Sequence, residues 1–247
     1  MQTLRTYVLL LPVLMGITLV GLAIQVTCLI SIGRGREFCR KYLLRPLCLC
    51  IFTLFGIKIH IKGRENIPEG QVIYIGNHSS TLDMPAICAL SLPRTRYFLS
   101  KYTYKFLPIT LVASALGTFY LDLQNKPKKR SETFKRASSI LKESGDSVFL
   151  TPEGMRVTSG EIGHFNKGAF HLAAELRVPL VPIFFYIPKA MDPGIGINTG
   201  SGNIVLHFLP AIDTSHWKAE NVEEIKEEVR QILIDCHSEY HQTQVAI

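Results

Sequence analysis

A histidine and an aspartate five residues apart, His78 and Asp83, form the pair most suited to chemistry in this sequence. They lie in the polar stretch 77–83, between an apolar run at 72–75 and a mixed run at 84–92. Their spacing does not make them neighbours on a regular helix. In a turn from a strand to a helix, however, the carboxylate can reach one imidazole nitrogen and leave the other facing a substrate. The alternative interpretation is a helix N-terminus capped by ordinary polar residues.

The surrounding sequence limits what His78 can do. It contains no G-x-S-x-G nucleophile elbow, no P-loop and no cysteine near His78 in the chain. His78 is therefore predicted to act as a general base that takes a proton from a substrate hydroxyl. Asp83 would fix the tautomer of the imidazole and stabilise the imidazolium that forms. The hydroxyl would then attack an electrophile directly, without an acyl-enzyme intermediate.

A second polar loop, 151–156, directly follows a predicted strand. Gly154 permits a tight bend and close approach of a ligand to the backbone. Arg156 offers a planar fork of donors suited to phosphate, and Glu153 could hold that arginine or bind a substrate hydroxyl. Because ligand sites in α/β domains gather at the carboxyl ends of strands, both polar loops can face one crevice. An exposed turn with a solvated glutamate and arginine is the alternative.

Apolar segments of strand and helix character alternate after residue 56, which predicts an α/β domain with a mixed sheet flanked by helices. The predicted strands cover 57–62, 72–76, 96–100, 117–123, 147–150, 178–186 and 204–208. The predicted helices cover 131–143, 168–177 and 222–236, with a further helix beginning near Leu82. Residues 124–130 are expected to form a basic loop. The Gly-rich stretch 193–203 is expected to be an exposed loop. It does not match the dinucleotide-binding motif, because Thr199 stands where the third glycine would be needed.

The N-terminal part of the chain is the most hydrophobic. Residues 7–32 are uncharged and form a run long enough to cross a bilayer. The run is too long for the apolar core of a typical signal peptide, which is the competing interpretation. A second apolar segment, 42–57, predicts an interfacial or re-entrant helix, with a core helix of the domain as the alternative. The expected organisation is a membrane anchor at 1–56 and a catalytic domain facing the cytoplasm at 57–247.

Charge is distributed unevenly. The net charge is +7, and residues 34–64 hold eight Lys or Arg against one acidic residue, Glu37. The positive-inside rule therefore predicts that the catalytic domain lies on the cytoplasmic face of the membrane. In a bacterium this membrane would be the inner membrane. A basic cluster between two apolar segments is suited to anionic lipid headgroups, so membrane phospholipids are expected as partners and nucleic acid is not.

The six cysteines show no disulfide framework and are expected to be reduced and structural. Cys48 and Cys50 have no downstream cysteine or histidine pair that would complete a zinc site. No metal site is therefore predicted.

Four ordered blocks resemble those of the glycerolipid acyltransferases typified by bacterial 1-acylglycerol-3-phosphate acyltransferase, and together they span about residues 57–186. Residues 77–83 resemble the H-x4-D block, and residues 151–156 resemble a block that usually reads F-P-E-G-T-R. The other two blocks correspond to 117–122 and 178–183, and residues 165–170 resemble the usual continuation of the third block.

This resemblance implies transfer of a fatty acyl group from an acyl-CoA or acyl carrier protein thioester to the sn-2 hydroxyl of lysophosphatidic acid. It implies that His78 is the base, that Asp83 is its partner, and that Glu153, Gly154 and Arg156 bind the acceptor headgroup. The thioester is a cosubstrate, and no cofactor is expected. The alternatives are transfer to another lysolipid, or a membrane lipid-binding protein on an inactive acyltransferase scaffold.

The sequence departs from the family pattern at two places. Leu123 occupies a position that commonly carries an arginine for the acceptor phosphate, and Thr151 and Met155 replace the usual Phe and Thr of the third block. Two explanations are open: a lysine supplies the missing charge, or the acceptor carries no phosphomonoester. The candidate lysines are Lys101, Lys105, Lys126 and Lys128.

Overall fold

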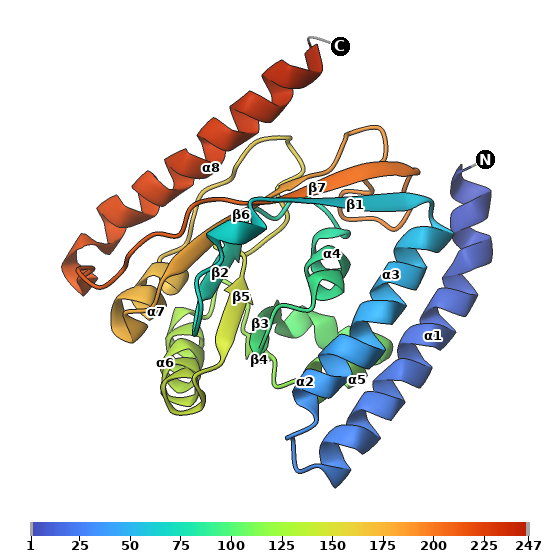
Figure 1. Ribbon diagram of the computed structural model, residues 1–247, viewed down its shortest axis with the longest axis horizontal. Helices are drawn as coiled ribbons and strands as arrows, with labels where there is room; N and C mark the ends of the chain where they lie inside the picture. The colour runs from blue at the N-terminus through green and yellow to red at the C-terminus, as the bar shows by residue number, and fades with distance from the viewer. Residues whose placement is uncertain (1, 246–247) are drawn as a thin grey trace.

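The computed structural model describes residues 2–245 and is built around one seven-stranded sheet (Figure 1). The strands are β1 (Ile57–Lys62), β2 (Ile73–Gly76), β3 (Thr95–Ser100), β4 (Phe119–Leu121), β5 (Ser147–Leu150), β6 (Leu180–Tyr186) and β7 (Gly202–Phe208). Their order in the sheet is β1-β7-β6-β2-β5-β3-β4. Strands β6, β2, β5, β3 and β4 are mutually parallel, whereas β7 is antiparallel to β6 and parallel to β1. The predicted mixed sheet is confirmed.

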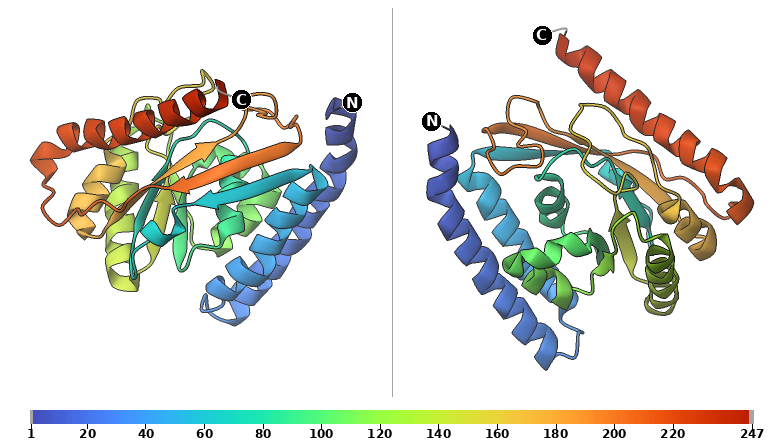
Figure 2. Two further views of the ribbon diagram at one scale, coloured as in Figure 1. Left: turned by 45° about the horizontal axis from the view of Figure 1, so that its top comes forward. Right: turned by 180° about the vertical axis from the view of Figure 1, so that it is seen from behind.

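Helices cover both faces of the sheet (Figures 1 and 2). One face carries α6 (Pro127–Ser144), α7 (Gly168–Leu176) and α8 (Val222–Val245). The other carries α1 (Gln2–Ile30), α3 (Arg45–Leu54), α4 (Asp83–Leu90) and α5 (Leu107–Ala115), with the short α2 (Arg36–Cys39) and a π-helical turn (Arg40–Leu44) between α1 and α3. Successive residues of β2 enter opposite cores: Ile73 and Ile75 pack toward α6 and α7, and Tyr74 packs toward α4. This alternation is expected of a strand buried on both faces.

Helix α1 lies beside α3 and α5 (Figure 1). Ile24 and Cys28 of α1 are buried in the same cluster as the sheet residues, and the Gln25 side-chain amide donates to the Leu111 carbonyl of α5 at 2.9 Å. Its other side exposes large apolar residues such as Leu11 and Leu19. Within the described residues, Thr3–Ile30 is the one helix segment long and apolar enough to cross a membrane. The predicted span and the predicted division at residue 56 remain predictions.

The second apolar segment contains α3, which is apolar on both sides. Cys48 and Phe52 are buried in the core, as the core-helix interpretation of this segment expects, whereas Leu49 and Leu54 are exposed. If α3 also lies at a membrane surface, only its exposed side, with Leu49 and Leu54, is available to contact lipid.

The prediction of a basic loop at 124–130 is wrong in its second half. Helix α6 already begins at Pro127 and continues to a left-handed Gly145. A proline is well suited to the first helical position, because the amide hydrogen it lacks would have no partner there. Arg130 consequently lies in the first turn of α6, with a direction fixed by the helix. The C-terminal helix also differs, because it extends beyond 236 to Val245.

Candidate active site

The polar turn after β2 is fixed to the neighbouring strand β6. The Asn77 side chain donates to the Phe185 carbonyl at 3.1 Å and accepts from the Phe185 amide at 2.8 Å. A Cβ at Gly76 would lie 2.5 Å from the Phe185 ring, so only glycine allows the strand this close. These contacts determine where His78 leaves the sheet.

The structure brings the predicted pair together. His78 Nδ1 lies 2.9 Å from Asp83 Oδ2, and the amides of Ser79 and Ser80 donate to the same carboxylate oxygen at 3.0 and 2.9 Å. Asp83 is fully buried, and the His78 side chain is 16% exposed. Within residues 2–245, His78 Nε2 has no hydrogen-bond partner. The imidazole is therefore oriented from one nitrogen and accessible at the other.

Burial raises the pKa of the Asp83 carboxyl, while hydrogen bonds from His78 and the Ser80 amide oppose that rise. The second carboxylate oxygen, Oδ1, is buried without a partner among the described residues. A carboxylate in this environment attracts the proton on His78 Nδ1 more strongly than an exposed one would. Asp83 is thus suited to stabilise a charged imidazolium at His78.

Glu153 connects the second polar loop, residues 151–156, to the turn that carries His78. Its Oε2 accepts the His78 amide at 2.7 Å, and its Oε1 accepts the Gly163 amide at 2.9 Å. The Val157 amide also donates to the His78 carbonyl at 2.7 Å. Glu153 is 3% exposed, so both its oxygens are engaged by backbone away from solvent. These contacts differ from the predicted contact with Arg156 or a substrate hydroxyl, and they make Glu153 a positioning residue.

Burial raises the pKa of the Glu153 carboxyl to about 7, from 4.5 for the ordinary group. The native protein then binds this proton more tightly than the unfolded chain, so the resulting stability is complete below pH 4.5 and lost as the pH rises through 7. The effect is on the order of 3 kcal/mol across this window. We therefore expect the thermal midpoint of the wild type to fall, relative to Glu153→Gln, between pH 5 and pH 7.5.

The exposed Glu161→Gln is the matched control for this experiment, because it should follow the wild type at every pH. A constant difference between the midpoints of the wild type and Glu153→Gln across the pH series would contradict the buried, titrating carboxyl.

The other two predicted binding residues lie at the rim of the loop. Gly154 adopts a left-handed φ of +71°, and Arg156 is exposed and makes no hydrogen bond or ion pair within the described residues. Leu123 is 52% exposed. Of the lysines considered as its substitutes, Lys101 is paired with Asp122 at 2.5 Å. Lys105, Lys126 and Lys128 are exposed.

The loop between β6 and β7 lies against the turn that carries His78, a contact that the sequence did not predict. The Thr81 amide donates to the Gly194 carbonyl at 2.9 Å, and its hydroxyl donates to the Gly196 carbonyl at 2.7 Å. The same loop accepts a hydrogen bond at the Thr199 carbonyl from Arg5 of α1 at 3.0 Å. The only sequence signal was a Gly-rich stretch after a strand, since both carbonyls belong to glycines. The N-terminal helix is thus connected to the turn that carries His78.

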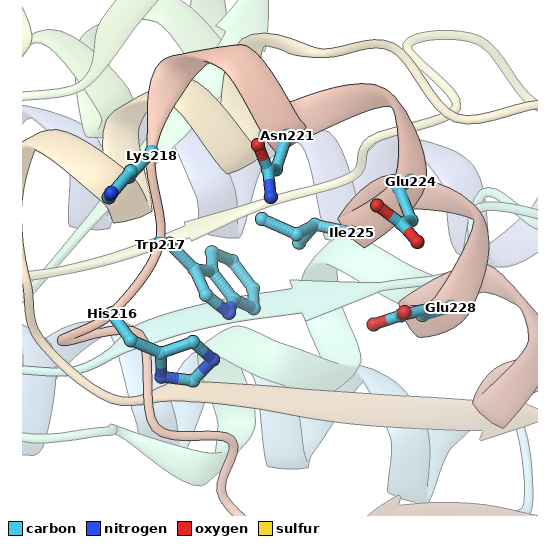
Figure 3. A pocket seen from close by; sticks show the side chains of 7 residues that line it. All are labelled: His216, Trp217, Lys218, Asn221, Glu224, Ile225 and Glu228. Atoms are coloured by element: carbon cyan, nitrogen blue, oxygen red, sulfur yellow. The ribbon is translucent and has the colours of Figure 1, made fainter.

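A separate cavity of about 210 Å³ lies between α8 and the segment before it (Figure 3). It is lined by His216, Trp217, Lys218, Asn221, Glu224, Ile225 and Glu228. This segment is attached beside the start of β6, where the Thr214 hydroxyl donates to the Val178 carbonyl at 2.8 Å. The cavity therefore lies near the end of the sheet where β6 begins, whereas the His78 turn follows the last residue of the parallel strand β2.

The fold and the site together define an α/β protein with a His–Asp pair at the carboxyl end of a central parallel strand. That arrangement is suited to activating a hydroxyl group. Within residues 2–245, no group of three or more His, Cys, Asp or Glu side chains is arranged to hold a metal ion.

Comparison with known proteins identifies the class further. The model of the Acyltransferase family matches residues 58–186, slightly more than half of the chain, and the chain belongs to this family. The predicted family and enzyme class, an acyltransferase, are confirmed. The match covers both polar loops and ends at the last residue of β6.

Two relatives and one solved structure show how similar this chain is to known acyltransferases. The chain is 28% identical to the 1-acyl-sn-glycerol-3-phosphate acyltransferase of Saccharomyces cerevisiae, over 75% of this chain and 62% of that protein. It is 38% identical to a chloroplastic enzyme of the same name from Arabidopsis thaliana, over 61% of this chain and 40% of that protein. The match therefore spans less than two thirds of either relative. The crystal structure of the 1-acyl-sn-glycerophosphate acyltransferase of Thermotoga maritima shares the fold, with a TM-score of 0.69, 20% identity and 98% coverage of both chains.

Proposed function

We propose that this protein transfers a fatty acyl group from a thioester to the sn-2 hydroxyl of 1-acyl-sn-glycerol-3-phosphate, forming phosphatidic acid in phospholipid biosynthesis. The donor is acyl-CoA or acyl-acyl carrier protein. The observation that carries the proposal is His78, held by the buried Asp83 at 2.9 Å with Nε2 free of protein partners in the described chain. The names of the Saccharomyces and Arabidopsis relatives support the choice of acceptor.

The chemistry needs no covalent enzyme intermediate. His78 Nε2 takes the proton of the acceptor hydroxyl as its oxygen attacks the thioester carbonyl carbon. The new C–O bond forms, the C–S bond breaks, and the proton on the imidazolium passes to the departing thiolate to give a free thiol. Asp83 stabilises the imidazolium between these steps, and Glu153 holds the backbone of His78 in place.

We further propose that the reaction takes place at a membrane surface, on the cytoplasmic face. The acceptor is amphiphilic, and the exposed apolar side of α1 is suited to lipid. Three further exposed aromatic and apolar residues, Tyr102, Phe106 and Leu107, lie on the segment that leads into α5 and are also suited to lipid. Part of the basic cluster has an internal role, because Arg40 is buried and pairs with Glu37 at 3.0 Å.

The test is the release of free thiol by the purified full chain in lipid vesicles. Acyl-CoA and acyl-acyl carrier protein are each offered with lysophosphatidic acid, lysophosphatidylethanolamine or monoacylglycerol. We expect rapid thiol release with lysophosphatidic acid and formation of phosphatidic acid. Turnover with another acceptor alone would replace this proposal with the alternative acceptor class, which the exposed, apolar Leu123 favours. Absence of turnover with every pair would refute acyl transfer itself.

A further inference from the structure

Three side-chain nitrogen atoms lie close to Gly154. Gly154 has no side chain, and three nitrogens are the nearest atoms to the position its Cβ would occupy. They are Asn166 Nδ2 at 2.9 Å, Gln124 Nε2 at 3.0 Å and Arg130 Nη2 at 3.8 Å. Their residues come from three separate segments: the loop before α7, the loop after β4, and the first turn of α6. Side-chain donors from three segments therefore converge on the loop at Gly154.

Two of these donors are available to a ligand. Asn166 Nδ2 already donates to the carbonyls of Pro152 and Glu153, both at 2.9 Å, so it supports the loop. Arg130 uses Nη1 to donate to the Asp122 carbonyl at 2.9 Å, which fixes the guanidinium. Neither Arg130 Nη2 nor Gln124 Nε2 has a partner within residues 2–245. Arg130 Nη2 is therefore free to bind an anion from a fixed direction, and Gln124 Nε2 is free to donate to the same anion.

The charges around this site also favour an anion. Arg130 is half-buried, so its positive charge is less screened than that of the exposed lysines. Arg156 follows Gly154 by two residues and is exposed. The side chain of the nearby Asp122 is occupied by Lys101. A guanidinium held in place presents a planar fork that matches the oxygens of a phosphate, which a mobile lysine cannot do.

We propose that Arg130 and Gln124, above Gly154, bind the phosphomonoester of the acceptor, and that Arg130 selects acceptors carrying this group. The proposal rests on the proposed function, since it concerns the acceptor of the same reaction. Gly154 directly follows Glu153, whose carboxylate holds the His78 amide. A phosphate at this site therefore lies beside the residue that positions the base, while the exposed Leu123 contributes no donor.

The test compares acyl transfer by the wild type, Arg130→Gln and Arg130→Lys, in the full chain in lipid vesicles. For Arg130→Gln we expect KM for lysophosphatidic acid to rise about 10- to 100-fold, with kcat and the KM for monoacylglycerol little changed. Arg130→Lys should recover only part of the loss, because it keeps the charge but not the fork. Arg136→Gln is the matched control, since it removes the same charge from an exposed position two turns along α6.

Gln124→Glu provides a second variant that leaves the Arg130 contact with Asp122 intact. It places a carboxylate against the proposed phosphate position, so KM for lysophosphatidic acid should rise while the thermal midpoint stays that of the wild type. If Arg130→Gln is unfolded, the KM of Gln124→Glu for lysophosphatidic acid tests the phosphate site instead. An unchanged KM in the folded Gln124→Glu and Arg130 variants, with an active wild type, overturns this inference alone.

Coenzyme A also carries a phosphomonoester, so the KM for the donor is measured in parallel. A rise in KM for acyl-CoA that disappears with acyl-dephospho-CoA, at unchanged KM for lysophosphatidic acid, would place the donor at Arg130 and overturn the acceptor assignment. A wild type that does not acylate lysophosphatidic acid overturns the proposed function, and this inference with it.

Discussion

Replacement of His78 with alanine is expected to lower kcat by about 10²- to 10⁴-fold, with little change in KM for either substrate. The variant loses the nitrogen that we propose takes the acceptor proton, while the backbone contacts of residue 78 with Glu153 and Val157 remain. Thiol release at saturating lysophosphatidic acid and acyl-CoA measures the effect. Because the turn keeps these contacts, the thermal midpoint should change little.

His171→Ala is the matched control for this experiment. His171 is exposed on α7 and its side chain makes no hydrogen bond or ion pair within residues 2–245, so its removal should leave kcat unchanged. Added imidazole should restore part of the activity of His78→Ala, because it supplies the missing base. Activity near that of the wild type in a folded His78→Ala would refute general-base catalysis by this residue.

Replacement of Asp83 with asparagine is expected to lower kcat by a similar factor, about 10²- to 10⁴-fold, as replacement of the orienting aspartate does in Ser-His-Asp triads. An asparagine oxygen in place of Oδ2 can still accept the Ser79 and Ser80 amides and hold the turn. It cannot stabilise an imidazolium at His78, because the amide is neutral. Thiol release again measures kcat.

A double variant separates this role from a purely structural one. If Asp83 acts through His78, the combination of His78→Ala with Asp83→Asn should lose little more activity than His78→Ala alone. Losses that multiply would show that Asp83 supports activity by another route, such as the stability of the turn. The thermal midpoints of all three variants provide the control for folding.

The sequence alone predicted the catalytic pair because its information is local. His78 and Asp83 lie in one turn between a strand and a helix, and a spacing of five residues suffices to bring the two side chains together. It also predicted that the two polar loops lie at the same end of the sheet, where the parallel strands finish. Strands β2 and β5 are parallel neighbours, so the turns that follow them leave at the same side.

Glu153 shows where local information ends. Its residue type and its position after a strand predicted a polar contact, but not that both its oxygens would be engaged by backbone amides. One of these amides belongs to His78, 75 residues away in the chain. Only the packing of the two loops brings them together, and it also determines the burial that raises the pKa of the Glu153 carboxyl to about 7.

Arg130 was missed for a related reason. The basic composition of 124–130 predicts a loop, whereas Pro127 is the first residue of a helix. Once α6 starts at Pro127, the helix determines the direction of Arg130, and its contact with the Asp122 carbonyl fixes the guanidinium near Gly154.

The sequence by itself therefore determined the alternation of strands and helices, the apolar N-terminal helix and the pair His78 and Asp83, because each depends on residues close together in the chain. Only the tertiary structure decided that α1 packs against α5, that the loop between β6 and β7 contacts Thr81, and which donors surround Gly154. Such contacts join distant segments, and no spacing along the chain encodes them. They arise when the segments bury their apolar faces together and their polar groups find partners at the edges of that core.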